Sequence, residues 1–398
     1  MPDTWTPTSW SHCPYPQAAT YPHAAHLAQA VLQLSQKKPL VHLNNILQLK
    51  RLIARAGRGQ AFILQGGDCA ESFNDCRPAM IRSQLNLIMK MAELLAPYIN
   101  GPVVPIGRIA GQYAKPRSSA WEQQQGITLP SYRGDLINAA KFDENARVPN
   151  PARLLKGHRS AAITLKFIHE KIKSTEFYTS HEALHLHYES ALTRRGKQGR
   201  WYDFSTHLPW LGIRTSQLDS AHVEFLRGIA NPIGIKIGPD ATPDWLISLL
   251  ERLNPQREAG RILLITRLGV QHVDHLLPTF IQATQTHNHP VTWACDPMHG
   301  NNLQTQSGIK TRHLDTVWQE LQRTFTIHQT HQSHLGGLHL EMTPASVTEC
   351  LGGKTNLSES DLKTAYHSLL DPRLNQQQAL ELIERFTDLL TARRHTNF

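Results

Sequence analysis

The sequence is poor in cysteine and lacks long apolar runs, and each scarcity excludes a class of protein. Its five cysteines are scattered without a C-x-x-C pair, which argues against a disulfide framework and favours a reducing compartment, the cytoplasm. No stretch of about 18 or more residues is continuously apolar, so no transmembrane helix is predicted. The first residues, Met1 to Cys13, lack a basic start followed by an apolar stretch, so no secretory signal is predicted either.

The charge balance is basic, with a formal net charge of +9 while the 23 histidines are counted as neutral. A nucleic-acid partner would predict basic residues clustered along one helix or interleaved with aromatic residues. Here the basic residues are dispersed, and several stand singly after apolar runs. Small anionic ligands therefore explain the basic residues that follow the apolar runs better than DNA or RNA does.

Short apolar runs that suit buried strands recur along the chain, each followed by a segment long enough for a helix. Eight are found, at Ala61–Leu64, Val103–Ile106, Glu176–Tyr178, Leu208–Leu211, Ile233–Ile237, Ile262–Thr266, Val291–Ala294 and Gly337–Leu340. Runs buried on both faces indicate a parallel sheet, and eight of them favour an α/β fold of the closed (β/α)8 type, a TIM barrel. An open doubly wound sheet is the alternative. The long spacing between the second and third runs predicts an insertion within Gln112–Ser174.

The first 60 residues, 1–60, are predicted to form an irregular tail and helices that pack on the barrel. Apolar residues at helical spacing from Leu27 to Leu34 predict one helix. A second helix is expected to be capped by Asn44 and to end near Arg55.

Residues 61–398 are assigned to the catalytic barrel with its C-terminal helices. The last helix is the clearest of these, because its apolar residues between Ala379 and Leu390 follow the i, i+3, i+4, i+7 pattern of a packed face. Asn375 is placed to cap it.

Reactive or charged residues stand at or just past the end of every apolar run. They are Asp68, Cys69 and Glu71 after the first run, Arg108, Lys115, Arg117 and Ser118 after the second, Ser180, His181 and Glu182 after the third, and then Arg214, Lys236, Arg267, His299 and Glu341. In a parallel barrel all of these positions meet at one mouth, where active sites are built.

Among the cations of this set, Arg108, Arg214, Lys236 and Arg267 come from four different runs. They would repel one another unless an anion joined them. Arginine suits phosphate and carboxylate because its planar fork donates two hydrogen bonds to paired oxygens. The mouth is therefore predicted to bind substrates that carry several negative charges.

Cys69, His299, Glu341 and Asp371 offer a thiolate, an imidazole and two carboxylates, a mixed set that suits a transition metal better than magnesium. These four are far apart in sequence, so a buried structural cysteine is an open alternative for Cys69. A nucleophilic cysteine fits the surrounding cations less well than phosphate chemistry does. The glycines after the first run lack the spacing of a P-loop or a dinucleotide fingerprint.

The chain resembles the type II 3-deoxy-heptulosonate 7-phosphate (DAHP) synthases over about residues 40 to 390. The resemblance is carried in order by Gln65–Phe73 (QGGDCAESF), Gly107–Ser118 (GRIAGQYAKPRS), Leu129–Asn138 (LPSYRGDLIN), Thr179–Glu189 (TSHEALHLHYE), Asp219–Pro239 (DSAHVEFLRGIANPIGIKIGP), Ile265–Gly269 (ITRLG), Cys295–Asn301 (CDPMHGN), Gly337–Thr343 (GLHLEMT) and Asp371–Asn375 (DPRLN). Motifs of this length and order are highly specific.

The resemblance implies a transferase of the shikimate pathway that condenses phosphoenolpyruvate with erythrose 4-phosphate and releases phosphate. It further implies a divalent metal, Mn²⁺ first and Co²⁺, Fe²⁺ or Zn²⁺ as alternatives, on Cys69, His299, Glu341 and Asp371. By the same resemblance, phosphoenolpyruvate is expected at Arg108, Arg214, Lys236 and Arg267, and the sugar phosphate near Lys115, Arg117 and Ser118. Lys236 and Glu182 are the two candidates for proton transfer.

The sequence departs from the family pattern before Arg214, where Ile213 stands in place of a usual acidic residue. Leu370 replaces a cysteine common before the metal-binding aspartate, and Asn302 replaces a common threonine. The short N-terminal extension resembles the compact forms of specialised pathways such as phenazine biosynthesis, so weak or absent feedback by aromatic amino acids is expected. A homo-oligomer, dimer or tetramer, is expected as well. An inactive homologue with a binding or regulatory role, or a barrel with an altered substrate, stays an alternative.

Overall fold

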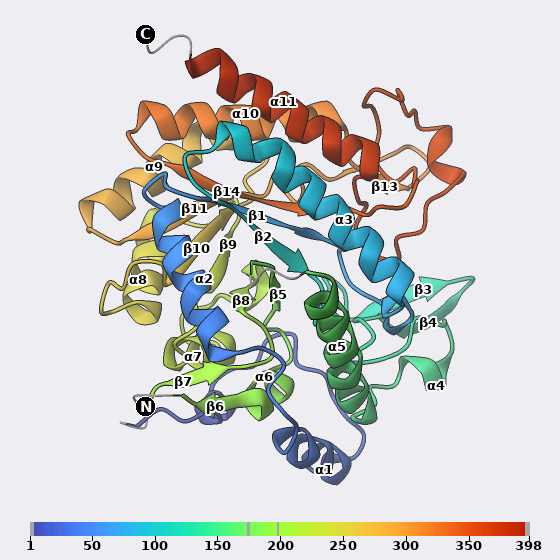
Figure 1. Ribbon diagram of the computed structural model, residues 1–398. Coiled ribbons are helices and arrows are strands. Elements are labelled where there is room, and N and C mark those ends of the chain that lie inside the picture. Colours follow the sequence, from blue (N-terminus) through green and yellow to red (C-terminus); the bar gives the residue numbers. More distant parts are fainter. Residues whose placement is uncertain (1–3, 173–175, 197–198, 395–398) are drawn as a thin grey trace.

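The computed structural model describes residues 4–172, 176–196 and 199–394, and its centre is a closed barrel of parallel strands (Figure 1). Each barrel strand pairs with the barrel strands that precede and follow it in sequence, and the last pairs with the first. The barrel strands are β1 (Phe62–Gly67), β2 (Val103–Arg108), β5 (Tyr178–Glu182), β8 (Leu208–Leu211), β9 (Ile233–Ile237), β10 (Ile262–Thr266), β11 (Val291–Cys295) and β14 (Leu335–Glu341). The (β/α)8 prediction is confirmed.

Every predicted apolar run contributes to a barrel strand, but the third was misplaced. Glu176 is exposed and lies outside β5, which begins at Tyr178 and continues through Glu182. Ser180, His181 and Glu182 follow the predicted run but belong to β5, and Glu182 is its last residue. The strand carries polar residues because it enters the mouth of the barrel, where a polar side chain can face a pocket.

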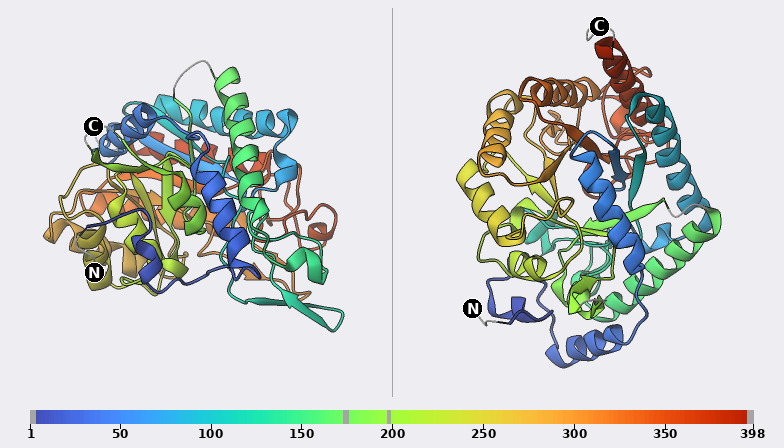
Figure 2. Two further views of the ribbon diagram at one scale, coloured as in Figure 1. Left: turned by 90° about the horizontal axis from the view of Figure 1, so that it is seen from below. Right: turned by 60° about the vertical axis from the view of Figure 1, so that its left-hand side comes forward.

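A helix follows each barrel strand and packs on the outside of the barrel, as the two views of Figure 2 show. These helices are α3 (Pro78–Leu95), α5 (Ala152–Lys171), α6 (Leu186–Leu192), α7 (Ala221–Gly228), α8 (Pro243–Leu253), α9 (Val273–Thr286), α10 (Leu314–Thr330) and α11 (Gln376–Arg394). Asn375 caps α11, because its Oδ1 accepts a hydrogen bond from the backbone N–H of Gln378 at 2.9 Å. The predicted capped terminal helix is confirmed.

Apolar side chains alternate between the two faces of the barrel wall. On β10, Leu263 and Ile265 belong to the interior core, whereas Ile262 and Leu264 pack with residues of the surrounding helices. Because both faces are buried, these strands read as continuous apolar runs in the sequence.

The N-terminal extension contains α1 (Ala24–Ser35) and α2 (Leu43–Ala56). Helix α2 closes the end of the barrel where the strands begin: Leu49 and Ile53 join the interior core, and the hydroxyl of Thr292 on β11 donates to the carbonyl of Ile53 at 2.7 Å. The predicted cap was wrong by two residues, because α2 begins at Leu43 after His42, which makes no side-chain capping bond, and Asn44 lies inside the helix.

The predicted insertion follows β2. It consists of the hairpin of β3 (Trp121–Gln124) and β4 (Ile127–Pro130) and the short helix α4 (Glu144–Arg147). The hairpin projects from the barrel at the lower right of Figure 1. Two smaller hairpins, β6 (Thr193–Arg195) with β7 (Trp201–Asp203) and β12 (Leu303–Gln304) with β13 (Lys310–Thr311), follow β5 and β11.

The five cysteines are free thiols, as expected. Within the described part of the chain, no helix combines the length and apolarity that crossing a membrane requires.

Candidate active site at the barrel mouth

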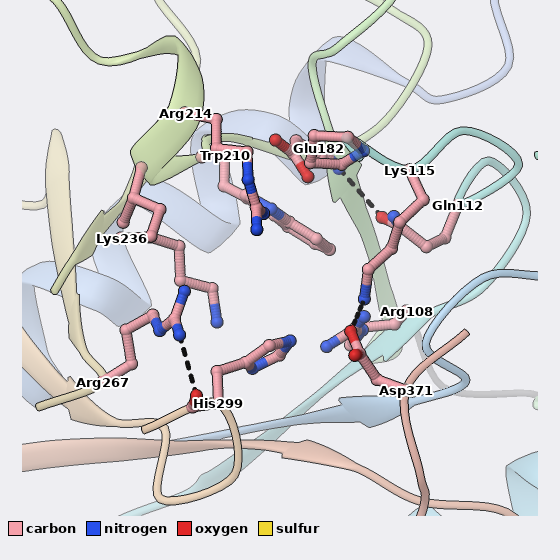
Figure 3. Close-up of a pocket in the computed structure, with 13 residues that line it drawn as sticks. Arg108, Gln112, Lys115, Glu182, Trp210, Arg214, Lys236, Arg267, His299 and Asp371 are labelled. Carbon is pink, nitrogen blue, oxygen red and sulfur yellow. Dashed lines mark hydrogen bonds and ion pairs between the residues drawn. The ribbon is translucent and has the colours of Figure 1, made fainter. Parts of the chain in front are cut away.

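A pocket opens at the end of the barrel where the parallel strands finish, opposite to helix α2 (Figure 3). Its lining consists of Arg108, Gln112, Lys115, Pro116, Glu182, Trp210, Gly212, Ile213, Arg214, Lys236, Arg267, His299 and Asp371. The cations predicted from the strand ends thus line one pocket, and their charged groups enter it from several sides in Figure 3.

Arg108, the last residue of β2, is only 2% exposed and lies 5.4 Å above the ring of Trp210. It donates hydrogen bonds to Nε2 of His339 at 2.8 Å and to Oε1 of Glu341 at 3.1 Å. Its Nε is buried without a hydrogen-bond partner among the described residues, and so is Nε of Arg267. Both side chains line the pocket, so a ligand with acceptor oxygens bound there would meet donors that still need partners.

Lys236 projects from β9 and forms an ion pair with Asp296, which follows β11. Burial lowers the pKa of Lys236 to about 8, although Asp296 opposes this shift. Arg108 and Arg267 lower the pKa further through charge repulsion. A lysine with this pKa can bind an anion as an ammonium and can also exchange a proton near neutral pH.

Glu182 ends β5 and faces the same pocket. Burial raises the pKa of Glu182, while the surrounding cations, Lys115 first, oppose that rise. Its backbone N–H donates to Oε1 of Gln112 at 2.9 Å, and its own Oε1 is buried without a partner among the described residues. Gly212 lies directly beside it, so a side chain there would displace the carboxylate, because a Cβ would approach this oxygen to 2.0 Å.

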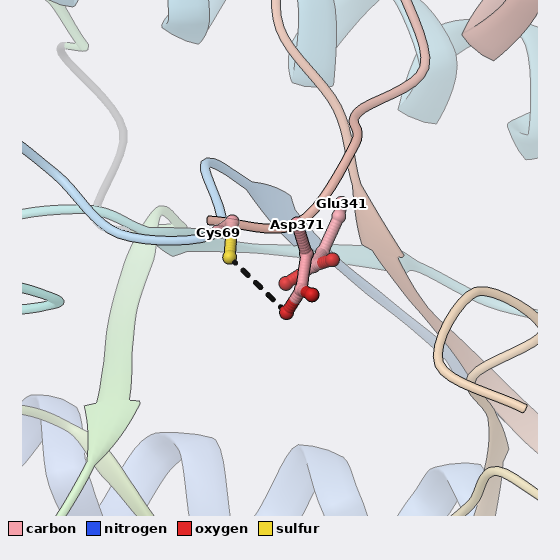
Figure 4. Close-up of side chains that lie close together, drawn as sticks. All are labelled: Cys69, Glu341 and Asp371. Atoms are coloured by element: carbon pink, nitrogen blue, oxygen red, sulfur yellow. Dashed lines mark hydrogen bonds between the residues drawn. The ribbon is translucent and has the colours of Figure 1, made fainter. Parts of the chain in front are cut away.

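Cys69, Glu341 and Asp371 form a second part of the site, adjacent to the pocket (Figure 4). Their potential ligand atoms lie within 4.8 Å of one another, and all three residues are buried. Nε2 of His299 lies 3.0 Å from Oε1 of Glu341, so the imidazole borders the same group. Three of the four residues predicted as metal ligands therefore lie together, although Cys69 and Asp371 are more than 300 residues apart in sequence, and His299 stands beside this group through its contact with Glu341.

The ammonium of Lys115 lies among the thiol of Cys69 and the carboxylates of Glu341 and Asp371. It is 2.6 Å from Sγ of Cys69 and 3.3 Å from Oε1 of Glu341, and it pairs with Oδ2 of Asp371. Burial lowers the pKa of Lys115, but these three neighbours outweigh burial and hold its pKa above the ordinary value. A site that gathers a thiol and two carboxylates around a cation fits a divalent metal ion in charge and in donor chemistry.

Two more cations hold the outer oxygens of these carboxylates. Arg312, which is fully buried, donates to Oε2 of Glu341 at 2.9 Å, and Lys310 pairs with Oδ1 of Asp371. One oxygen of each carboxylate is thereby left facing Lys115 and the inner site. Burial alone would raise the pKa of Glu341, but His299 and then the neighbouring cations outweigh burial and hold it well below its ordinary value.

Arg117 and Ser118, the predicted contacts of a sugar phosphate, are not among the residues that line this pocket. Arg117 pairs through Nη2 with Oε1 of Glu122 at 3.0 Å, and its backbone N–H donates to Oε1 of Gln17 at 2.9 Å. Ser118 is exposed.

Sequence reasoning placed Asp296 at the end of the seventh run but assigned no role to Asp296, Trp210, Gln112 or Arg312. Trp210 and Gln112 line the pocket, while Asp296 and Arg312 are fully buried behind it. For Asp296 a signal was present, since it stands in the CDPMHGN motif three residues before His299.

Comparisons with known proteins agree with one another. The model of the Class-II DAHP synthetase family matches residues 5–174 and 168–386. The phospho-2-dehydro-3-deoxyheptonate aldolase of Neurospora crassa is 40% identical, with 95% of this chain and 92% of that protein aligned. The protein of the same name from Streptomyces coelicolor is 38% identical over 94% and 95% of the two chains. In fold, the chain is similar to the solved phospho-2-dehydro-3-deoxyheptonate aldolase of Francisella tularensis, with a TM-score of 0.54, 14% identity and 92% and 97% coverage.

Proposed function

Since the chain belongs to the class-II DAHP synthetase family, we propose that it condenses phosphoenolpyruvate with erythrose 4-phosphate to give 3-deoxy-D-arabino-heptulosonate 7-phosphate and phosphate. In this role it supplies the first intermediate of aromatic biosynthesis. The observation that carries the proposal is the barrel mouth, where a pocket lined by cations borders a buried group of one thiol and two carboxylates.

The cations bind and orient phosphoenolpyruvate. Arg108 and Arg267 each keep a buried Nε–H without a partner among the described residues, and the ammonium of Lys236 lines the same pocket. A substrate with a phosphate and a carboxylate supplies acceptors for these donors and neutralises their repulsion. Binding both substrates in one pocket also brings two anions into contact that would repel each other in water.

Cys69, His299, Glu341 and Asp371 would hold the divalent ion, with Mn²⁺ as the first candidate. When bound there, such an ion supplies Lewis-acid chemistry, since it polarises the aldehyde oxygen of erythrose 4-phosphate. Sulfur and imidazole nitrogen beside two carboxylates favour a transition metal over Mg²⁺.

The chemistry forms one carbon–carbon bond and releases phosphate. The methylene carbon of phosphoenolpyruvate attacks the aldehyde carbon, the aldehyde oxygen takes up a proton, water adds at C2, and the C2–O bond to phosphate breaks. Lys236 and Glu182 face the pocket with perturbed pKa values and are the two groups placed to move these protons. Trp210 and Arg108 both line the pocket, where the guanidinium lies 5.4 Å from the centre of the indole ring.

The first prediction is that the purified chain consumes phosphoenolpyruvate only when erythrose 4-phosphate is present. Prior treatment with a chelator is expected to abolish the consumption, and added Mn²⁺ is expected to restore it, because the ligand group would lose and regain its ion. Loss of phosphoenolpyruvate absorbance measures the rate, and released phosphate checks the stoichiometry. Consumption that resists chelation would contradict the metal role. No consumption with any metal would favour an altered or inactive site, for which Ile213 in the lining is the motivating feature.

A second prediction concerns pH. Below about pH 8 Lys236 carries an ammonium that binds the anionic substrate, and above this value it becomes neutral. We therefore expect kcat/KM for phosphoenolpyruvate to fall as the pH rises through about 8, with Asp296, Arg108 and Arg267 as the charged groups that set the midpoint. The profile of Lys236→Arg, which keeps its charge, should lack this alkaline fall. A wild-type profile that stays flat through pH 9.5 would contradict the assignment.

A further inference from the structure

Asp296 stands between the two parts of the site and touches both. It follows β11, is fully buried, and directs Oδ2 toward two partners: Nδ1 of His299 at 2.7 Å and the ammonium of Lys236. Its other oxygen, Oδ1, accepts hydrogen bonds from the backbone N–H groups of Met298 at 3.1 Å and His299 at 3.2 Å. The carboxylate therefore cannot turn without losing several partners.

The contact with His299 determines which ring nitrogen carries the proton. A carboxylate only accepts hydrogen bonds when ionised, so Nδ1 of His299 must be the donor. Nε2 faces a second carboxylate, Oε1 of Glu341 at 3.0 Å, so a metal bound at Nε2 would take the place of a proton there while Asp296 keeps the other proton on Nδ1. This is the tautomer that a metal on Nε2 requires.

The contact with Lys236 acts on the pocket side. Lys236 is buried and lies near Arg108 and Arg267. Burial and the two neighbouring positive charges both disfavour the ammonium form. Asp296 is the nearest opposing negative charge, so it keeps a positive charge at the place where an anionic substrate would bind.

We propose that Asp296 is a positioning residue that fixes the tautomer of His299 and the charge of Lys236 with one oxygen, and so joins the metal centre to the anion pocket. The proposal rests on the proposed function and adds a residue to it. Two losses follow when the carboxylate is removed. The metal ligand His299 loses its orientation, and the substrate cation Lys236 loses its counter-ion.

The test compares Asp296→Asn with Asp296→Ala. In the asparagine variant the amide oxygen keeps the two backbone N–H groups, so its NH₂ group faces Nδ1 of His299 and drives the ring proton to Nε2. In the alanine variant water can enter and the ring can keep either tautomer. We expect Mn²⁺ affinity, measured by titration calorimetry without substrate, to fall by about 10- to 100-fold in Asp296→Asn and by less in Asp296→Ala.

The two variants should also share a second effect on the pH profile. Without Asp296 the pKa of Lys236 loses the influence that opposes burial, so the alkaline fall of kcat/KM for phosphoenolpyruvate should move to lower pH at saturating Mn²⁺. Asp274→Asn is the matched control, because Asp274 is an exposed carboxylate paired with Arg323 on the outside of the barrel. It should match the wild type in both measurements.

A purely structural role makes the opposite prediction, because alanine leaves the larger cavity and should then be the worse variant in both stability and Mn²⁺ affinity. A lower Mn²⁺ affinity in Asp296→Ala than in Asp296→Asn would overturn the inference, and so would wild-type affinity in both variants. Either result would leave the proposed function intact. If Asp296→Asn does not fold, the pH profile of Asp296→Ala decides. A fall of kcat/KM for phosphoenolpyruvate at the same pH as in the wild type would also overturn the inference. A wild-type chain that binds no Mn²⁺ and consumes no phosphoenolpyruvate would instead overturn the proposed function, and the inference with it.

Discussion

Replacing Cys69 by serine is expected to lower Mn²⁺ affinity by at least about 100-fold, since losing a residue that merely supports a ligand already costs 10- to 100-fold. The serine hydroxyl stays protonated at neutral pH and is a poor substitute for a thiolate as a metal ligand. Burial raises the pKa of the Cys69 thiol to about 12 without an ion, and the charge of Glu341 adds to this effect. Metal binding must therefore displace a proton, and the affinity of the wild type should rise with pH.

The fold should survive this substitution, because serine is slightly smaller than cysteine and its hydroxyl can still pair with Lys115 or Asp371. Calorimetric titration with Mn²⁺ measures the affinity, and the melting temperature of the metal-free chain checks the fold. Cys76→Ser is the control, because Cys76 lies in the same loop after β1 but contacts Tyr113 instead of the ligand group. Equal turnover in Cys69→Ser and the wild type would refute the role of the thiol in the metal centre.

The barrel strands could be predicted because their signal is local. β8, β9 and β10 begin and end where the apolar runs Leu208–Leu211, Ile233–Ile237 and Ile262–Thr266 do. A strand covered by helices outside and core inside needs apolar residues at consecutive positions, so its boundaries are visible in the sequence. β5 was misplaced because its second half, through Glu182, faces the polar mouth, where the strand has no apolar signature.

Which side chains share the mouth could also be predicted, since the ends of parallel strands meet there whatever their distance in sequence. How those side chains pair could not. Arg312 directly follows the β12–β13 hairpin, is 29 residues from Glu341 in sequence, and meets it only in the folded barrel. Trp210 was hidden within an apolar run, where a tryptophan reads as core. These pairings depend on three-dimensional packing, so spacing along the chain does not predict them.

Replacing Arg267 by alanine is expected to raise the KM for phosphoenolpyruvate by roughly 10- to 100-fold, because one or two charge-assisted hydrogen bonds of about 1.5 kcal/mol or more are lost. Arg267 follows β10 and lines the pocket, and its Nε–H has no partner among the described residues. Its Nη2 donates to the backbone carbonyl of His299 at 2.8 Å, so the guanidinium is held in place before substrate arrives. The KM of Arg267→Lys for phosphoenolpyruvate should lie between the values of the wild type and Arg267→Ala, since lysine keeps the charge but not the planar fork.

Arg323→Ala separates this effect from a general loss of positive charge. Arg323 is exposed, pairs with Asp274 at 2.8 Å and donates to the carbonyl of Val270, so it supports the same loop from outside the pocket. Its removal should leave the KM for phosphoenolpyruvate near the wild-type value. An unchanged KM and kcat in Arg267→Ala would count against substrate binding by this residue. A lower Mn²⁺ affinity with an unchanged KM would instead mean that Arg267 acts by holding the His299 carbonyl, because that contact links the guanidinium to the metal-binding side of the site.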